Sequence, residues 1–439
     1  MRRATAADAE ALVAFTADVL RNQDADEPDA RTAAWTRDLV TGRHPTCSTD
    51  DFTVVEDLRI GAIVSALCLI SQTWSLAGLP CRVGQVELVG THPDYRGRGL
   101  VRQQFEIVHD WSRRRREHFQ VIDGVPWFYR QFGYEPALEL RGGGSIAVPP
   151  GLLAPVDVER YRVRPATEDD LGFIARIGAA TAPRYLVTCV RDEPLWRYEL
   201  RSHDALSMYR PELRIVEARD GTPLGFVAHL PRLVASTLWV LGCEMVTEDL
   251  YRAAAPSILH ALQTAGEGFA GGDGGERCER LGFWFSAQHP FYQPLPAVRV
   301  EPPYVWHIRV PDLPGFLRHL APLLERRLAA SVHAGHTGTL RLSFYRDGLQ
   351  LTFDHGRLAA VAHWTQPRDL LGVERGQLTG APRAHGSFPD QTFLQLLFGY
   401  RSLAELEYAF PDCLTRSDAA RSLLAELFPK CPSNVWALL

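Results

Sequence analysis

The stretch VELVGTHPDYRGRGLVRQQ, Val86–Gln104, most constrains what this chain can fold into. It starts with apolar residues typical of a strand, turns at Pro93, and runs through an Arg/Gly-rich loop, Arg96–Gly99, into a segment with helical periodicity. The first N–H groups of a helix have no intrahelical partners, and glycine lets a ligand approach the backbone closely. The stretch therefore predicts an anion site suited to phosphate, to which Arg98 and Arg102 add positive charge.

Length and composition indicate an ordinary globular protein of several domains. The 439 residues are 46% hydrophobic and 23% charged with a net charge of -5, so nucleic acid is not an expected partner. No apolar leader follows Met1 and no run reaches the length of a membrane span, which favours a cytoplasmic protein without membrane association. The eight cysteines form no CxxC pair, and His333 and His336 lack a third ligand, so we expect reduced thiols and no metal.

Helix and strand signals alternate through residues 1–150. We expect helices at Ala6–Leu20, Thr32–Val40 and Leu100–Arg116, and strands at Phe52–Val55, Ile60–Leu69, Val83–Val89, Gln120–Ile122 and Glu135–Leu140. The tract RGGGSIAVPPG that follows is typical of a linker and ends this first domain.

The chain then echoes its own beginning. YRVRPATEDDLGFIARI, from Tyr161, resembles the opening RRATAADAEALVAF, which predicts a second copy of the first domain over residues 151–311. In this copy the strand Thr237–Val246 stands where the anion-loop strand belongs, but no glycine/arginine loop follows it. We interpret the copy as degenerate. A last unit, 312–439, predicts a sheet with helices packed on one face.

The first domain resembles the GNAT acyl-CoA transferases. Their cofactor motif, Q/R-x-x-G-x-G/A at a helix start, is matched here by Arg96 and Gly99, whereas Val101 replaces the final small residue. The downstream phrase FYRQFGY, Phe128–Tyr134, is similar to the closing segment of that fold. This resemblance implies acetyl-CoA as co-substrate.

The order of domains resembles the enhanced intracellular survival (Eis-like) acetyltransferases. The resemblance implies an α/β (α+β) chain with a catalytic GNAT domain (1–150), a degenerate GNAT-like domain (151–311) and a sterol carrier protein-like domain (312–439). It also implies acetyl transfer to a small-molecule primary amine, and a closed homo-oligomer, commonly a hexamer.

The same resemblance assigns roles to individual residues. It implies that the cofactor is bound by Val89 and Thr91 on the strand before the loop and by the loop and helix start, comprising Arg96, Gly97, Arg98, Gly99, Leu100 and Val101. Tyr129 would give the leaving thiolate its proton, with Tyr134 as the competitor that we expect in the core. The carboxylate of Leu439 would act as the base, with Glu87 as the second candidate.

The acceptor site is expected beside the first helices. Trp35 and the acidic residues Asp24, Asp26 and Glu27 are candidates to attract a cationic polyamine or an aminoglycoside-like amine, although an acidic loop is more often simply solvated. Two other functions stay open at this point. The chain could be a scaffold whose last domain binds an apolar ligand, or an acyltransferase that prefers a longer acyl chain.

Overall fold

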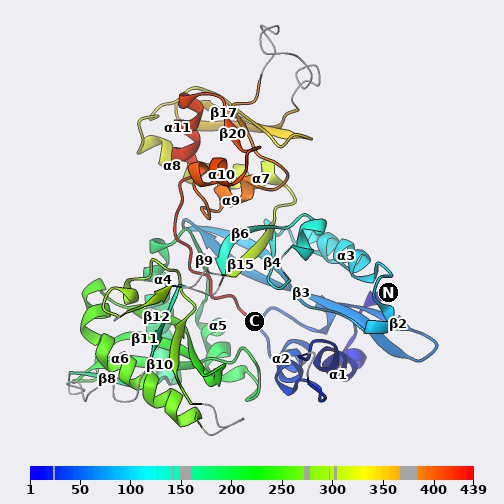
Figure 1. Ribbon diagram of the computed structural model, residues 1–439, viewed down its shortest axis with the longest axis vertical. Coiled ribbons are helices and arrows are strands. Elements are labelled where there is room, and N and C mark those ends of the chain that lie inside the picture. Colours follow the sequence, from blue (N-terminus) through cyan, green and yellow to red (C-terminus); the bar gives the residue numbers. More distant parts are fainter. Residues whose placement is uncertain are drawn as a thin grey trace.

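The computed structural model of the protein describes residues 1–22, 25–125, 127–140, 143–148, 160–270, 277–295, 297–300, 304–365 and 383–439. These residues form three lobes, each built on its own mixed sheet with helices packed against it (Figure 1). The α/β (α+β) fold class predicted from the sequence, two similar mixed-sheet units followed by a third, is confirmed.

The first sheet has the order β1-β2-β3-β4-β5-β15-β6, with β9 paired to β3. Its strands are β1 (Arg2–Arg3), β2 (Phe52–Asp57), β3 (Ala62–Leu76), β4 (Leu79–Thr91), β5 (Phe119–Ile122), β6 (Glu135–Leu140), β9 (Val187–Cys189) and β15 (Tyr304–Arg309). All neighbours are antiparallel except β4 and β5, which are parallel and joined through helix α3 (Leu100–Arg114). Such a connection needs a helix because parallel strands cannot be joined by a hairpin.

Helices cover both faces of this sheet. Helices α1 (Ala9–Val19) and α2 (Ala30–Val40) pack with Cys68 and Ile70 of β3 on one face. Helix α3 packs with Leu67 and Leu69 on the other. Successive side chains of a strand point to opposite faces, so the apolar run of β3 serves both layers.

The second sheet has the order β14-β7-β13-β12-β11-β10-β8. Its strands are β7 (Gly144–Ala147), β8 (Tyr161–Pro165), β10 (Glu212–Ala218), β11 (Pro223–Val234), β12 (Thr237–Met245), β13 (Arg280–Phe283) and β14 (Arg299–Val300). Helices α4 (Leu171–Thr181), α5 (Glu193–Arg197) and α6 (Glu248–Phe269) belong to this lobe.

The first two sheets exchange strands. Strand β15 comes late in the chain but lies between β5 and β6 of the first sheet, and β9 also pairs with that sheet. Strand β7, in turn, follows β6 directly but pairs with β13 of the second sheet. The predicted boundaries at residues 150 and 311 therefore do not separate one sheet from the other.

Strand β7 also corrects the linker predicted at RGGGSIAVPPG. Its glycines permit close packing, because a Cβ at Gly144 would lie 2.4 Å from the Val298 side chain and one at Gly143 would lie 2.6 Å from the Phe285 carbonyl oxygen. The same composition thus serves a tightly packed strand.

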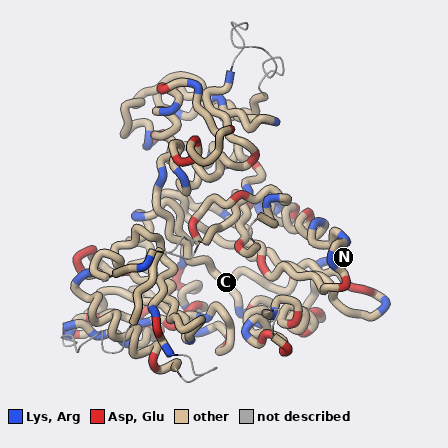
Figure 2. Tube along the Cα trace, in the orientation of Figure 1, with Lys and Arg blue, Asp and Glu red and all other residues tan. Residues whose placement is uncertain are grey.

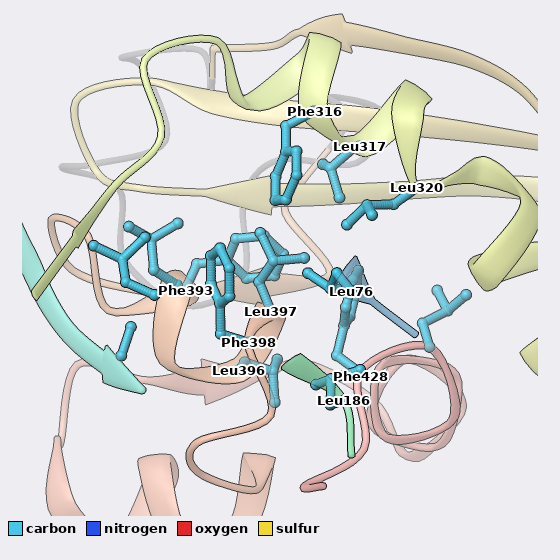
Figure 3. Close-up of a cluster of buried hydrophobic side chains, with 14 of the residues drawn as sticks. Leu76, Leu186, Phe316, Leu317, Leu320, Phe393, Leu396, Leu397, Phe398 and Phe428 are labelled. Carbon is cyan, nitrogen blue, oxygen red and sulfur yellow. The ribbon is translucent and has the colours of Figure 1, made fainter. Parts of the chain in front are cut away.

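The third lobe is a small sheet with five helices. Its strands are β16 (Gly338–Ser343), β17 (Gly348–Asp354), β18 (Arg357–His363), β19 (Gly386–Ser387) and β20 (Leu414–Thr415), and its helices are α7 (Leu313–His319), α8 (Ala321–Ala329), α9 (Phe393–Leu397), α10 (Leu403–Ala409) and α11 (Asp418–Leu427). Its core is continuous with that of the first sheet. Figure 3 shows Phe316 and Leu317 facing Phe398, with Leu76 and Leu186 close to Phe428.

After α11 the chain leaves the third lobe and runs between the other two (Figure 1). The end segment, 434–439, is largely buried, and Leu438 is 1% exposed. Among the described residues no helix has the length and apolar character needed to cross a membrane. Positively and negatively charged residues occur on all three lobes (Figure 2), and all eight cysteines are free thiols.

We expect Trp306→Ala on β15 to destabilise the first sheet, because Trp306 is 1% exposed and its ring packs edge-on against Trp74 of β3 at 5.7 Å. The free energy of unfolding in urea should fall by about 3–5 kcal/mol. Hydrogen exchange should rise in β5 and β6 before it rises in the second sheet. Val300→Ala on β14, at a side chain 72% exposed, is the control and should change stability by less than about 0.5 kcal/mol.

Candidate active site

The site is organised around a strand edge that lacks a neighbour. Strand β4 pairs with β3 from Leu79 to Thr91, but it pairs with β5 only at Val83, Gly84 and Gln85. Beyond Gln85 the two parallel strands diverge, so one edge of β4 keeps backbone groups that β5 does not engage. Such an edge can hydrogen-bond an extended ligand in the way that it would bind another strand.

A bulge turns the open part of β4. The register between β3 and β4 shifts between Ala66 and Cys68, and Leu88 opposite has a φ of +53°. A bulge of this kind bends a strand locally and re-aims its backbone groups. The predicted contact residues Val89 and Thr91 therefore lie directly after a bend, on the diverging part of β4.

The glycine loop follows. Its two glycines have left-handed backbones, with φ of +74° at Gly97 and +73° at Gly99, which is the N-cap of α3. A Cβ at either position would meet nothing within 4 Å, so the space above the loop is open. The backbone conformation therefore requires glycine here, and it leaves the N-terminus of α3 accessible to an anion.

Three arginines surround this loop and are themselves anchored. Arg96 Nε donates to the Thr91 carbonyl oxygen at 3.2 Å, and Arg98 donates to the Asp94 carbonyl oxygen at 2.9 Å. Arg102 donates to Gln131 Oε1 at 2.8 Å. These contacts engage only part of each guanidinium, so the arginines hold positive charge around the loop and keep donors for a phosphate.

Loop, strand and helix enclose one cavity of about 620 Å³. All eight predicted cofactor residues line it: Val89, Thr91, Arg96, Gly97, Arg98, Gly99, Leu100 and Val101. Val19 and Leu20 at the end of α1 close one side, and the segment around Tyr129 closes the other. The structure thus brings together residues that the sequence predicted separately.

Tyr129 lies in a helical turn, η4 (Phe128–Phe132), and is 7% exposed. Burial raises the pKa of its hydroxyl well above the usual range, and the Glu87 carboxylate raises this pKa further. Tyr129 therefore stays protonated at neutral pH and can only donate when a strong acceptor is close. The competitor Tyr134 is 1% exposed and lies 3.0 Å from His109 Nε2, within the core as expected.

Leu439 lies apart from the glycine loop. It packs at the border of the cluster that contains Leu88 and Trp35, and Tyr198 of the helical turn η7 (Tyr198–Ser202) donates to its backbone oxygen at 3.3 Å. Just before it, Arg191 donates to the Ala437 carbonyl oxygen at 3.1 Å. The tail therefore reaches the α1/α2 face of the first sheet, next to the bulge.

The predicted acceptor residues have different positions. Trp35 is 4% exposed and packs edge-on against Tyr209 at 4.7 Å, so it has little surface for a substrate. Asp26 and Glu27 are exposed in the connection between α1 and α2. Asp24 lies outside the described residues.

Sequence reasoning missed His307. The inserted strand β15 places its ring 6.0 Å from that of Tyr129, with β15 shifting register against β6 between Trp306 and His307. His307 is fully buried, and burial together with the charge of Arg130 lowers its pKa to about 4. No local pattern could have indicated this contact, because it depends on the strand exchange.

The second sheet has a related geometry without a loop. Strand β12 pairs with β13 only from Thr237 to Val240, so these parallel strands also diverge. Helix α6 starts at Glu248, directly after β12, and the Tyr251 hydroxyl accepts the Met245 N–H at 3.3 Å and donates to Glu244 at 2.7 Å. In the second sheet the Tyr251 side chain thus hydrogen-bonds the edge of β12, whereas the corresponding edge of β4 in the first sheet is open.

One group of potential metal ligands occurs among the described residues: Cys81, His118 and His319, whose ligand atoms lie within 4.8 Å of one another. His118 Nδ1 accepts the Arg82 N–H at 3.0 Å, and His319 Nε2 contacts the Pro80 carbonyl oxygen at 2.9 Å. A neutral His118 then carries its proton on Nε2, which suits a hydrogen-bonded contact between α7 and the first sheet better than a metal ligand.

Comparison with known proteins agrees with this geometry. Residues 1–137 match the family model described as an acetyltransferase (GNAT) domain. A search of the curated proteins finds no match. Solved structures with the same fold along nearly the whole chain include a probable N-acyltransferase from Enterococcus faecalis, with a TM-score of 0.67 and 16% identity over 99% of this chain and 97% of that one.

Two further structures are similar over their full length. A GCN5-related N-acetyltransferase from Kribbella flavida has a TM-score of 0.63 and 17% identity, covering 100% of this chain and 99% of that one. Eis1 from Mycobacterium abscessus has a TM-score of 0.58 and 16% identity, covering 99% and 98%. Residues 1–137, which include the strand, loop and helix start that line the cavity, thus form an acyltransferase domain of the GNAT class, a fold that uses acyl-CoA as co-substrate.

The buried His307 makes stability depend on pH. Its folded pKa of about 4 lies below the ordinary value of 6.5, so the unfolded chain binds a proton that the folded chain does not. Stability should fall as the pH drops from about 6.5 to 4, by up to about 1.4 kcal/mol per pH unit. We expect His307→Gln to remove this share of the slope in urea titrations. His355→Gln, at a ring 89% exposed, should leave the slope unchanged.

Proposed function

We propose that the protein transfers an acetyl group from acetyl-CoA to the primary amine of a small cationic acceptor by direct attack. The observation that carries this proposal is the single cavity where the diverging edge of β4, the glycine loop and Tyr129 meet. The glycine loop would hold the cofactor, the β4 edge would polarise the thioester carbonyl, and Tyr129 would donate the proton.

The cofactor residues fit acetyl-CoA. The pyrophosphate would be bound by the N–H groups at the start of α3 and by the guanidinium groups of Arg96, Arg98 and Arg102. The pantetheine arm would pair with the edge of β4 at Val89 and Thr91. After the bulge, the Val89 N–H would lie beside the thioester oxygen and stabilise the charge that develops there.

Proton transfer falls to Tyr129 and to a carboxylate. Tyr129 would protonate the departing thiolate. Its hydroxyl is protonated at neutral pH, and because its raised pKa makes it a weaker acid, its position beside the sulfur would have to supply the advantage. The base would take the proton of the attacking amine. The two candidates, Glu87 and the carboxylate of Leu439, both belong to the region next to the bulge at Leu88.

Acidic residues that follow α1 in the sequence support a cationic acceptor. Val19 and Leu20, which line the cavity, are followed after a few residues by the exposed Asp26 and Glu27. Their charges would raise the local concentration of a polyamine or an aminoglycoside-like amine. The third lobe would be the sterol carrier protein-like domain, and the continuous core in Figure 3 supports a role in holding the tail in place.

Acetyl-CoA should raise the melting temperature of the wild-type protein, and Gly99→Glu should abolish this shift. The substitution places a carboxylate where the pyrophosphate binds and forces a side chain into a left-handed backbone. Gly221→Glu is the matched control, because Gly221 also has a positive φ (+85°) and an open Cβ position but lies in the turn between β10 and β11 of the second sheet. A wild-type protein that gains no stability from acetyl-CoA would contradict the proposal.

Tyr129→Phe should lower kcat by about 10²-fold, the usual contribution of a general acid. The Michaelis constant for acetyl-CoA should stay within about twofold, because the phenyl ring still packs beside Gly124. Thiol release can be followed with spermidine, kanamycin and hexylamine as acceptors. Tyr134→Phe is the control, and retained turnover in Tyr129→Phe would remove the acid role only.

A further inference from the structure

A continuous series of side-chain hydrogen bonds joins Leu438, near the end of the sequence, to Glu87. Gln72 Nε2 on β3 donates to the Leu438 carbonyl oxygen at 2.8 Å and to Gln85 Oε1 at 2.6 Å. Gln85 Nε2 on β4 donates in turn to Glu87 Oε1 at 2.6 Å. All three side chains are at least 92% buried, with exposures of 6%, 0% and 8%.

The contacts of Gln72 fix the orientation of both side-chain amides in this series. Gln72 Oε1 accepts the backbone N–H of Leu438 at 3.2 Å and the indole N–H of Trp74 at 3.1 Å. Both groups can only donate, so the carbonyl of Gln72 must face them and its NH₂ must face Gln85. Gln85 then presents its oxygen to Gln72 and its NH₂ to Glu87.

We propose that Gln72 and Gln85 are positioning residues that couple the docked tail to Glu87, and that Glu87 is the base of the transfer reaction. This inference rests on the proposed function. Glu87 immediately precedes the bulge, and its carboxylate is the charged group that acts most strongly on the Tyr129 hydroxyl. This carboxylate raises the pKa of two titratable groups, Tyr129 of η4 and Cys68 of β3.

The two glutamines act together because each is a hydrogen-bond partner of the other, while Gln72 also binds Leu438 and Gln85 also binds Glu87. A buried amide without its hydrogen-bond partner is destabilising. Loss of one hydrogen bond in the series therefore lets the next side chain rotate toward another partner. Docking of Leu438 therefore favours one orientation of Glu87. By the same linkage, the orientation of Glu87 favours docking of the tail.

Gln85→Leu tests the central link. Hydrogen exchange at the Leu438 amide, followed by mass spectrometry of the C-terminal peptide, should become at least tenfold faster although the substitution lies on a different strand. With spermidine as the probe amine, kcat should fall about tenfold, the acidic limb of the pH–rate profile should move up by about one pH unit, and the Michaelis constant for acetyl-CoA should not change.

Gln120→Leu is the matched control. Gln120 is a fully buried glutamine on the neighbouring β5, with its amide directed to Ser112 and its oxygen accepting from Arg309. Loss of its amide should leave both the Leu438 exchange rate and the acidic limb as in the wild-type protein. If Gln85→Leu behaves like this control, the coupling is overturned.

Glu87→Gln separates the two halves of the inference. A glutamine can still present an oxygen to Gln85, so the Leu438 amide should keep its protection, whereas turnover should fall at least 10²-fold. Retained turnover would overturn the role of Glu87 as base. A wild-type protein that neither binds acetyl-CoA nor acetylates any probe amine would instead refute the proposed function, and the exchange experiment would still decide whether the tail and Glu87 are coupled.

Discussion

The incomplete pairing of β4 is the constraint on which the site depends. Its β3 edge is hydrogen-bonded along the whole strand, whereas its β5 edge is engaged only from Val83 to Gln85. Full pairing would leave no backbone donors for a ligand, and a free strand would not hold them still. Because one edge fixes the strand and the other stays available, the backbone itself becomes a rigid, pre-formed binding element.

The strands that diverge need support elsewhere, and the strand exchange provides it. With β5 turned away from β4, the sheet continues through β15, which comes from beyond the second lobe and binds both β5 and β6. The second sheet depends on β7 in the same way. Each of these two sheets contains a strand that lies outside its own main stretch of sequence: β15 in the first and β7 in the second. The two lobes are therefore expected to unfold together rather than independently.

Local features of the sequence predicted the local parts of the site. The glycine loop, the start of α3 and the turn that carries Tyr129 each follow from residues adjacent in the chain, and the two left-handed glycines explain why the motif needs them. The partners of β15, β7 and the tail are set by contacts between distant segments. For that reason the glycines at 143 and 144 were interpreted as a linker, and His307, Gln72 and Gln85 carried no sequence signal.

The segment Leu313–Ala329, whose apolar residues have helical spacing throughout, shows the same limit on a smaller scale. The structure has two helices separated at Leu320, and the break allows Phe316, Leu317 and Leu320 to enter the core shared with the first sheet. Helical periodicity indicated the apolar residues correctly, but the direction in which each helix must point depends on the partner surface.

Burying a pair of glutamines is unfavourable unless their amides are hydrogen-bonded, whereas apolar side chains of similar size would need no partners. The buried Gln72 is stabilised only when its donors and acceptors are all used, and two of its five hydrogen bonds go to Leu438. An undocked tail would therefore leave polar groups unsatisfied inside the first sheet, next to β4. The arrangement links the geometry around Glu87 to the position of the third lobe, because the tail that reaches Gln72 follows α11 of that lobe, and the core of that lobe is continuous with the first sheet.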